Sequence, residues 1–217
     1  MVGEEAMSVT CYALTHGNRW HFLRDMLESF IENALPETQL FVGVQFPISP
    51  EMDYTIKAFE YQPNVTFVMF SENIGLNRYP ELLKYGEFVS TIVDMDDDAI
   101  IPAGFEKAFE SVLADKRFGW VGIPVKGADI MLTGKHREWK FENRLTVIES
   151  AVGGGLAATR RDTYDMLGGF GLGKTLFDPE DARYQRKCVN ADYLCGNIKE
   201  LTHEHHNSWQ WQIKYGT

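Results

Sequence analysis

Residues Phe88–Pro102 read FVSTIVDMDDDAIIP, an apolar run that ends in a cluster of acids. The apolar part, Phe88–Val93, predicts a buried strand, because short apolar runs between polar residues are typical of strands covered on both faces. Four carboxylates follow within five positions, at Asp94, Asp96, Asp97 and Asp98. They repel one another unless a divalent cation relieves the repulsion, and hard oxygen ligands favour Mg²⁺ or Mn²⁺. The alternative is a solvated acidic turn that caps the next helix.

Strand-like and helix-like segments alternate along the first half of the chain. Apolar runs predict strands at Val9–Leu14, Leu40–Phe46 and Val65–Phe70 before the one at Phe88–Val93. Apolar residues at helical spacing predict helices between the strands and another after Pro102. This α/β alternation is typical of a mostly parallel sheet flanked by helices, in which ligands bind beyond the carboxyl ends of the strands. The aspartates stand at one such end.

The second half predicts a smaller, mixed region. Strand signals occur at Trp120–Val125, Asp129–Leu132, Leu145–Ala151 and Ile198–Thr202, and helical signals at Asp162–Leu167 and Pro179–Val189. Neither a linker nor a repeat divides the chain, so we expect a single domain over residues 8–217 after a tail of residues 1–7.

Composition narrows the class of protein. The 217 residues carry a formal net charge of −10, which argues against duplex DNA or an anionic membrane as a partner, although a local basic patch can exist within an acidic total. No apolar run approaches the roughly 18 residues of a membrane span, and the N-terminus lacks a signal-peptide pattern. The three cysteines have no metal-binding spacing. We therefore expect a cytoplasmic protein, soluble or peripheral at a membrane.

Five stretches together resemble glycosyltransferase family 2 and its GT-A relatives. Residues 93–102 look like the family's DXD region, and residues 14–19 with the helix that follows look like its first strand, loop and helix. The remaining matches are Glu72–Asn77 with its loop before the DXD strand, Gly153–Arg161 with Gly168–Phe170 as its acceptor-side segment, and Glu180-Asp181 as its Glu-Asp pair. They stand in the family's order over residues 8–206.

The resemblance implies a Rossmann-like GT-A fold and a metal-dependent transferase that moves a sugar from a nucleotide sugar to an acceptor hydroxyl with inversion. Residues of about 8–102 would bind the nucleotide sugar, and about 103–217 would bind the acceptor. The metal would be Mn²⁺ or Mg²⁺. A UDP-sugar is favoured as donor, with a GDP- or dTDP-sugar as alternatives. The acceptor would be a glycan, a lipid-linked sugar or a small molecule.

The resemblance also implies roles for single residues. Asp96 would contact the ribose or base side of the nucleotide and the metal, and Asp98 the metal and the diphosphate. Asp181 would be the general base, with Glu180 orienting the acceptor or capping its helix. His203 is the first choice for a histidine that completes the metal site. His205 is the second, because in an extended chain its side chain points to the same side as that of His203. Further candidates for nucleotide-sugar contacts are Thr15, Arg19, Gln45, Asn73, Arg78, Asp97 and Gly154.

One departure from the family pattern leaves the base open. The loop after the second strand usually holds an aspartate that reads the base, but here it holds Gln45. Two alternative functions stay open as well. One is a phage-type glycosyltransferase acting on modified bases in DNA, which a basic groove would support. The other is an inactive domain that only binds a nucleotide sugar, against which the intact Asp96, Asp98 and Asp181 speak.

Overall fold

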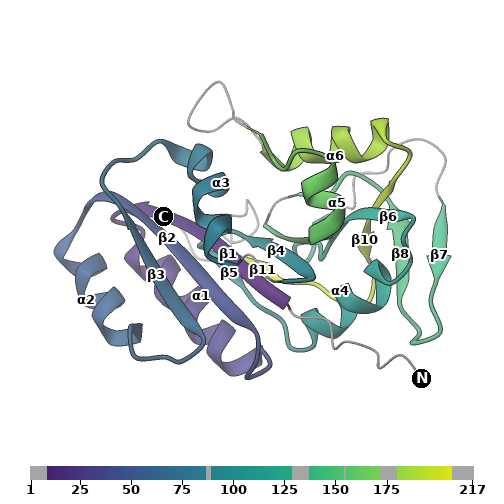
Figure 1. Cartoon of the computed structure of the whole chain (residues 1–217). Coiled ribbons are helices and arrows are strands. Elements are labelled where there is room, and N and C mark those ends of the chain that lie inside the picture. The colour runs from purple at the N-terminus through teal and green to yellow at the C-terminus, as the bar shows by residue number, and fades with distance from the viewer. Residues whose placement is uncertain (1–8, 87–88, 129–136, 154, 172–179, 207–217) are drawn as a thin grey trace, which may run out of the picture.

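A single nine-stranded sheet carries strands from both halves of the chain (Figure 1). The computed structural model describes residues 9–86, 89–128, 137–153, 155–171 and 180–206. The strand order is β3-β2-β1-β4-β9-β6-β10-β8-β7, and a two-stranded sheet pairs β11 with β5. The strands are β1 (Val9–Gly17), β2 (Gln39–Ile48), β3 (Val65–Phe70), β4 (Thr91–Met95), β5 (Ala99–Ile100), β6 (Phe118–Gly122), β7 (Glu138–Lys140), β8 (Thr146–Glu149), β9 (Leu156–Arg160), β10 (Leu194–Ile198) and β11 (Glu204–His205).

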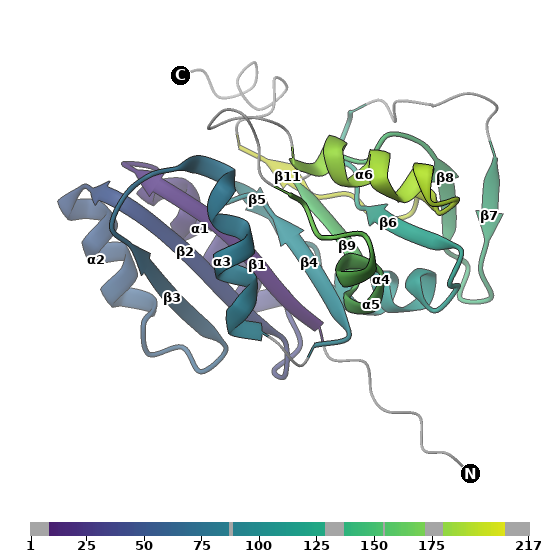
Figure 2. The ribbon, with the colours of Figure 1, turned by 45° about the horizontal axis from the view of Figure 1, so that its top comes forward.

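Helices cover both faces of the large sheet (Figure 2). One face packs against α1 (Trp20–Asn33), α2 (Pro50–Phe59) and α4 (Phe105–Leu113). The other packs against α3 (Tyr79–Leu82), α5 (Arg161–Met166) and α6 (Glu180–Asn190). Two short 3₁₀ helices, Gly75–Arg78 and Leu83–Gly86, flank α3. None of the described helices is long and apolar enough to cross a bilayer.

The sheet has a hydrophobic core on each face, and successive side chains of a strand belong alternately to the two cores. In β1, Cys11 and Ala13 join the core under α1, whereas Tyr12 joins the core under α3. In β4, Val93 and Ile92 divide in the same way. Because successive side chains of a strand point to opposite faces, a strand buried on both sides must be apolar throughout. This is why the first-half strands read as continuous apolar runs.

The first four strands confirm the predicted parallel arrangement. β1 pairs in parallel with β2 and β4, and β2 pairs in parallel with β3. The whole sheet is mixed rather than mostly parallel, because β9 lies antiparallel between β4 and β6. β8 and β7 add two further antiparallel pairs beyond β10.

The second-half strands differ from the prediction in several places, and β7, β9 and β11 were not predicted at all. The last strand of the large sheet is Leu194–Ile198, so the prediction of Ile198–Thr202 was wrong by almost its whole length. The expected strand at Asp129–Leu132 and the tail of residues 1–7 lie outside the described residues.

Candidate active site

The acidic cluster lies where two chain segments far apart in sequence meet. β4 ends at Met95, and Asp96–Asp98 form the turn that leads into β5. β11 pairs antiparallel with β5, which places His205 opposite Ala99. The two-residue strand β11 therefore brings the C-terminal histidine segment back over the carboxyl end of β4.

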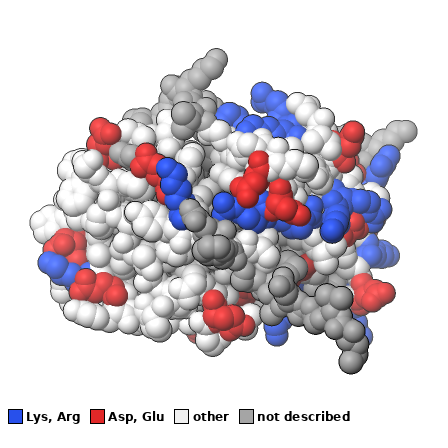
Figure 3. Space-filling view, in the orientation of Figure 1, with Lys and Arg blue, Asp and Glu red and all other residues white. Residues whose placement is uncertain are grey.

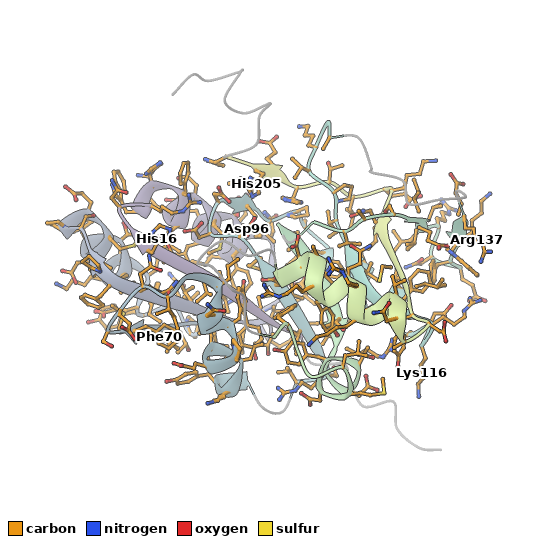
Figure 4. All side chains as sticks on the ribbon, turned by 90° about the horizontal axis from the view of Figure 1, so that it is seen from above. His16, Phe70, Asp96, Lys116, Arg137 and His205 are labelled. Atoms are coloured by element: carbon orange, nitrogen blue, oxygen red, sulfur yellow. The ribbon has the colours of Figure 1, made fainter. Side chains whose placement is uncertain are left out.

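Asp96, Asp98 and His205 form a compact group of metal-type donors. The Nε2 atom of His205 lies 2.9 Å from an oxygen of Asp96 and 2.9 Å from an oxygen of Asp98. One donor atom from each residue falls within 4.8 Å of the others. The Asp98 side chain is 2% exposed, whereas that of Asp96 is 46% exposed. Figure 4 shows Asp96 and His205 side by side at this end of the sheet. Two carboxylates and an imidazole suit Mn²⁺ or Mg²⁺.

When no metal cation is bound, protonated His205 offsets the negative charges of Asp96 and Asp98. Burial lowers the pKa of His205, but the hydrogen bonds and negative charges of Asp96 and Asp98 raise it to about 10. Burial raises the pKa of Asp98, but the hydrogen bonds and charges of His205 and Arg19 lower it below its ordinary value. His205 is therefore a cation at neutral pH and stands between the two carboxylates.

Arg19 neutralises the inner side of the acidic turn. Its guanidinium lies 2.7 Å from Asp97 and 2.9 Å from Asp98, and its Nε donates to both Asp97 oxygens at 2.9 and 3.0 Å. Burial raises the pKa of Asp97 above its ordinary value, although Arg19 and the hydroxyl of Thr15 act in the opposite direction. The guanidinium also stacks over Phe22, 4.9 Å from the ring centroid. Arg19 thus links the first loop to the acidic turn.

His203 lies beside the donor group but does not join it. Its backbone is fixed to the loop after β6, since its N–H bonds Pro124 and its carbonyl accepts from Lys126. Its Nδ1 lies 2.8 Å from the carbonyl oxygen of Ile123. Burial, followed by the charge of His205, lowers the pKa of His203 to about 4. The structure therefore places His205, rather than the first-choice His203, against the aspartates.

A cavity of about 360 Å³ opens next to this histidine. His203 and Gly155 line one part of its wall, and Asp181 and Gln185 of α6 line another. Asn197 of β10 completes the polar lining, and the loop after β6 supplies apolar surface. Asp181, the predicted base, therefore faces the same cavity as the histidine that adjoins the donor group.

Gly155 allows this close packing of histidines. A Cβ atom at this position would lie 2.9 Å from Nε2 of His203 and 3.3 Å from the ring of His205. The carbonyl of Gly155 accepts a hydrogen bond from the N–H of Asp96 at 3.1 Å. The sequence marked the run Gly153–Gly155 without showing which glycine needs to lack a side chain.

The other predicted nucleotide contacts line the loops at the same end. The side-chain oxygen of Gln45 accepts from the N–H of Ile74 at 3.0 Å, and that of Asn73 accepts from the N–H of Gly75 at 2.8 Å. The first bond ties the 71–78 loop to β2, and the second lies within the loop. Thr15 is buried at the end of β1 beside Asp97. The side chains of Arg78 and Glu180, and the whole of Gly154, lie outside the described residues.

Three polar residues escaped the sequence reasoning or were left undecided there. Asn197 donates to Ser150 at 2.8 Å and to the carbonyl of Ala151 at 2.7 Å, which fixes the cavity wall. Gln185 bonds the same wall segment, and nothing in the local pattern marks either residue. Asp94 is 1% exposed and accepts a short hydrogen bond from the hydroxyl of Tyr79. Its position inside an apolar strand was the available signal.

Charge on the described surface is of mixed sign. On the face shown in Figure 3, Lys and Arg gather over the half that contains α5 and α6, with acids among them. Among the described residues near α5, Arg161 lies 2.8 Å from Asp165 and Arg160 lies 3.2 Å from Asp162. On this face, acidic side chains interrupt the basic ones, so the basic side chains do not form a continuous track.

Solved structures share this architecture. The chain aligns with GalNAc-T7, solved with UDP, GalNAc and Mn²⁺, at 13% identity and a TM-score of 0.71, over 94% of this chain and 44% of that one. It aligns with the mannosyltransferase PcManGT from Pyrobaculum calidifontis, solved with GDP-Man and Mn²⁺, at 18% identity and a TM-score of 0.70, over 97% and 60% of the two chains. It aligns with residues 1–349 of S. aureus TarS at 13% identity and a TM-score of 0.69, over 91% of this chain and 59% of that one.

The chain has the GT-A fold of glycosyltransferases, which confirms the predicted fold class. It spans about half the length of the solved structures that it matches. No protein-family model matches the sequence, and no curated protein matches it. At these identities the likeness establishes the fold, and the activity has to be argued from the site.

Proposed function

We propose that this chain is a metal-dependent glycosyltransferase that moves a sugar from a nucleotide sugar to an acceptor hydroxyl with inversion. One observation carries the proposal: the donors of Asp96, Asp98 and His205 lie within 4.8 Å of one another, next to a cavity that Asp181 also lines. This arrangement supports a site in which a diphosphate-bound cation and a carboxylate base would act around one space. Matched structures that hold Mn²⁺ with UDP or GDP-Man support the choice of ligands.

The donor set fits a divalent cation by its chemistry. Asp98 is buried and Asp96 is partly exposed, so the site has a fixed inner ligand and an open outer side. Such a cation, when bound, would offset charge on the diphosphate leaving group. To act as a ligand, His205 has to give up the proton that it shares with Asp96 and Asp98. Arg19 remains paired with the Asp98 oxygen that His205 does not contact, and its positive charge favours the ionised form of that carboxylate.

The remaining residues bind and orient the substrates. Thr15, Arg19, Gln45, Asn73 and Arg78 belong to segments at the carboxyl ends of β1, β2 and β3, where the nucleotide would lie. Asp97, which belongs to the acidic turn, and Gly154, which lies outside the described residues, are the other candidates for contacts with the nucleotide sugar. A UDP-sugar is the first donor to test, followed by GDP- and dTDP-sugars.

Asp181 would take the proton in the transfer step. The acceptor oxygen attacks the anomeric carbon and its proton passes to the Asp181 carboxylate. The bond from the anomeric carbon to the phosphate oxygen breaks, and its electron pair leaves with the nucleoside diphosphate. Attack opposite the leaving group inverts the anomeric configuration. Glu180, the preceding residue, would orient the acceptor.

Two measurements test the proposal. The first is thermal stabilisation by UDP-, GDP-, dTDP- and CMP-sugars with and without Mn²⁺, for which we expect a metal-dependent shift with one nucleotide. The second is hydrolysis of that donor, with water as the acceptor, in the Asp181→Asn variant. We expect normal donor binding and a loss in rate of about 10²- to 10⁴-fold, the usual contribution of a general base.

Asp192→Asn is the matched control, because Asp192 is exposed just beyond the other end of α6. A normal rate in the Asp181 variant would refute the base assignment. Metal-dependent binding without turnover in the wild-type protein would instead favour an inactive binding domain. Transfer to hydroxymethylated DNA but not to glycans would favour the DNA-modifying alternative.

A further inference from the structure

The strand β3 forms one edge of the large sheet and pairs only with β2 (Figure 2). The two strands are parallel, and the N–H of Leu40 in β2 donates to the carbonyl of Asn64 at 2.8 Å. In a parallel pair the backbone groups of every second residue face the partner strand. With this register, the N–H and carbonyl groups of Phe67 and Met69 face outward. No described residue on the outer side of β3 bonds these groups.

The sequence of β3 lacks the features that normally prevent an edge strand from pairing. Such edges are usually protected by charged side chains, by proline or by a bulge. β3 reads Val-Thr-Phe-Val-Met-Phe, with no charge and no proline, and its pairing with β2 has no register shift. The other edge strand, β7, is three residues long, and Glu138 and Lys140 are exposed on it. Of the two edges of this sheet, β3 is therefore the one suited to pairing with another strand.

Large apolar side chains are exposed around the same edge. Met69 belongs to β3, and Tyr61, which is 85% exposed, lies in the turn that leads into it. Phe46 follows the last β2 residue that pairs with β3. Tyr85 lines a cavity of about 290 Å³ together with Phe70 at the end of β3. These are four of the seven large apolar side chains that are exposed among the described residues: Phe46, Tyr61, Met69 and Tyr85.

A second copy of the chain can pair with this edge in a defined register. In an antiparallel pair, two opposite residues whose backbone groups face each other exchange two N–H···O=C bonds. Phe67 of one copy can therefore pair with Met69 of the other, and twofold symmetry repeats this pair about an axis at Val68, which gives four bonds. Pairing Phe67 with Phe67 would instead require Val65, whose N–H already donates to the carbonyl of Gln62 at 3.1 Å.

We propose that β3 is a self-association surface at which two copies of the chain join their sheets by antiparallel pairing of Phe67 with Met69. If a large side chain has about 200 Å² of surface, covering the four exposed apolar side chains buries about 450 Å² on each copy. With the strand edges added, the total lies at the low end of protein interfaces, so we expect a dissociation constant of roughly 1–100 µM. Glu60 and Glu72 flank the strand, and salt that screens their repulsion should favour the dimer. β4 lies three strands away from this edge, so the dimer leaves the proposed metal site open.

Sedimentation equilibrium of the full chain, without nucleotide sugar, tests the proposal over roughly 1 µM to 1 mM protein. Met69→Lys places a charge opposite Phe67 of the other copy. Met69→Pro removes an outward-facing N–H and keeps the bonds to β2, since proline is tolerated on the open side of an edge strand. Met166→Lys is the matched control, because Met166 is also an exposed methionine but lies on α5. Thermal unfolding of each variant reports whether it folds.

We expect both Met69 variants to raise the dissociation constant at least about 10-fold and the Met166 variant to change it less than about 2-fold. Amide hydrogen exchange gives a second readout. The amides of Phe67 and Met69 should exchange more slowly in concentrated than in dilute protein, whereas those of Thr66 and Val68, which face β2, should exchange alike in both. A monomer over the whole range, a dimer that Met69→Lys leaves intact, or exchange at Phe67 and Met69 that does not depend on concentration would overturn the inference.

Discussion

Replacing Arg19 with methionine should destabilise the protein through Asp97. The substitution keeps most of the side-chain volume and removes the guanidinium that bonds both oxygens of Asp97 and one of Asp98. Losing one member of a buried ion pair costs about 3–5 kcal/mol. Because the Arg19 side chain is 25% exposed, we expect the lower end, about 3 kcal/mol. For a chain of this size that corresponds to a fall in Tm of roughly 6–12 °C.

The effect should depend on pH in a direction set by Asp97. The pKa of this carboxyl is raised in the folded protein by burial, and the loss of Arg19 should raise it further. A carboxyl with a raised folded-state pKa destabilises the protein above that pKa, and protonation relieves the cost as the pH falls. The difference between Arg19→Met and wild type should therefore be smaller at pH 5 than at pH 8.

Urea unfolding followed by circular dichroism at both pH values measures the effect. Arg24→Met is the matched control, since Arg24 lies on α1, the helix that Arg19 precedes, with a side chain 46% exposed and paired with Asp25 at the surface. We expect the control to change the free energy of unfolding by less than about 0.5 kcal/mol. If Arg19→Met costs no more than Arg24→Met at pH 8, the guanidinium does not hold the acidic turn.

Three further predictions follow from the site. Gly155→Ala should cost about 1–3 kcal/mol of stability through overpacking, whereas Gly153→Ala, whose Cβ meets nothing within 4 Å, should be nearly neutral by thermal unfolding. With a pKa of about 10, His205 should release a proton when Mn²⁺ binds near pH 7.5, so calorimetric heats should vary with the ionisation enthalpy of the buffer; identical heats in all buffers would contradict this. Tyr79→Phe removes the hydrogen bond to Asp94 and should cost about 1.5–3 kcal/mol in urea unfolding; a neutral result would mean that the bond contributes little.

Sequence patterns located the first half of the fold well. Strands such as Val65–Phe70, buried on both faces, must be apolar throughout, and the intervening helices show helical spacing of apolar residues. β4 was placed slightly early, because Asp94 and Met95 continue the strand. The predicted strand ended at Val93 because acids are expected in loops, although Asp94 lies buried within β4.

The second half was harder because long-range pairing decides its strands. β9 reads Leu-Ala-Ala-Thr-Arg, which has little local strand preference, and it forms where it can pair with both β4 and β6. β10 contains Gly196 and Asn197, which weaken the local signal in the same way. The mixed character of the sheet comes from β9, which is antiparallel to β4 and β6, and from β8, which is antiparallel to β10.

Site residues show the same division between local and long-range information. The acidic turn could be read directly, since Asp96–Asp98 are consecutive and follow a strand. The histidine that contacts these aspartates could not be predicted from the sequence. His203 and His205 are two positions apart, so in an extended segment both side chains are expected on the same side. The choice depends on two separate pairings, the bridge of His203 to Val125 and the pairing of β11 with β5.

The most direct test of the account is the electron paramagnetic resonance signal of free Mn²⁺, titrated with protein and the nucleotide sugar that stabilises it. We expect the wild-type protein to bind one Mn²⁺, Asp98→Asn and His205→Asn to lose most of this binding, and His203→Asn to retain it. Unchanged Mn²⁺ binding in Asp98→Asn, or its loss in His203→Asn alone, would contradict the assignment of Asp96, Asp98 and His205 as the metal site.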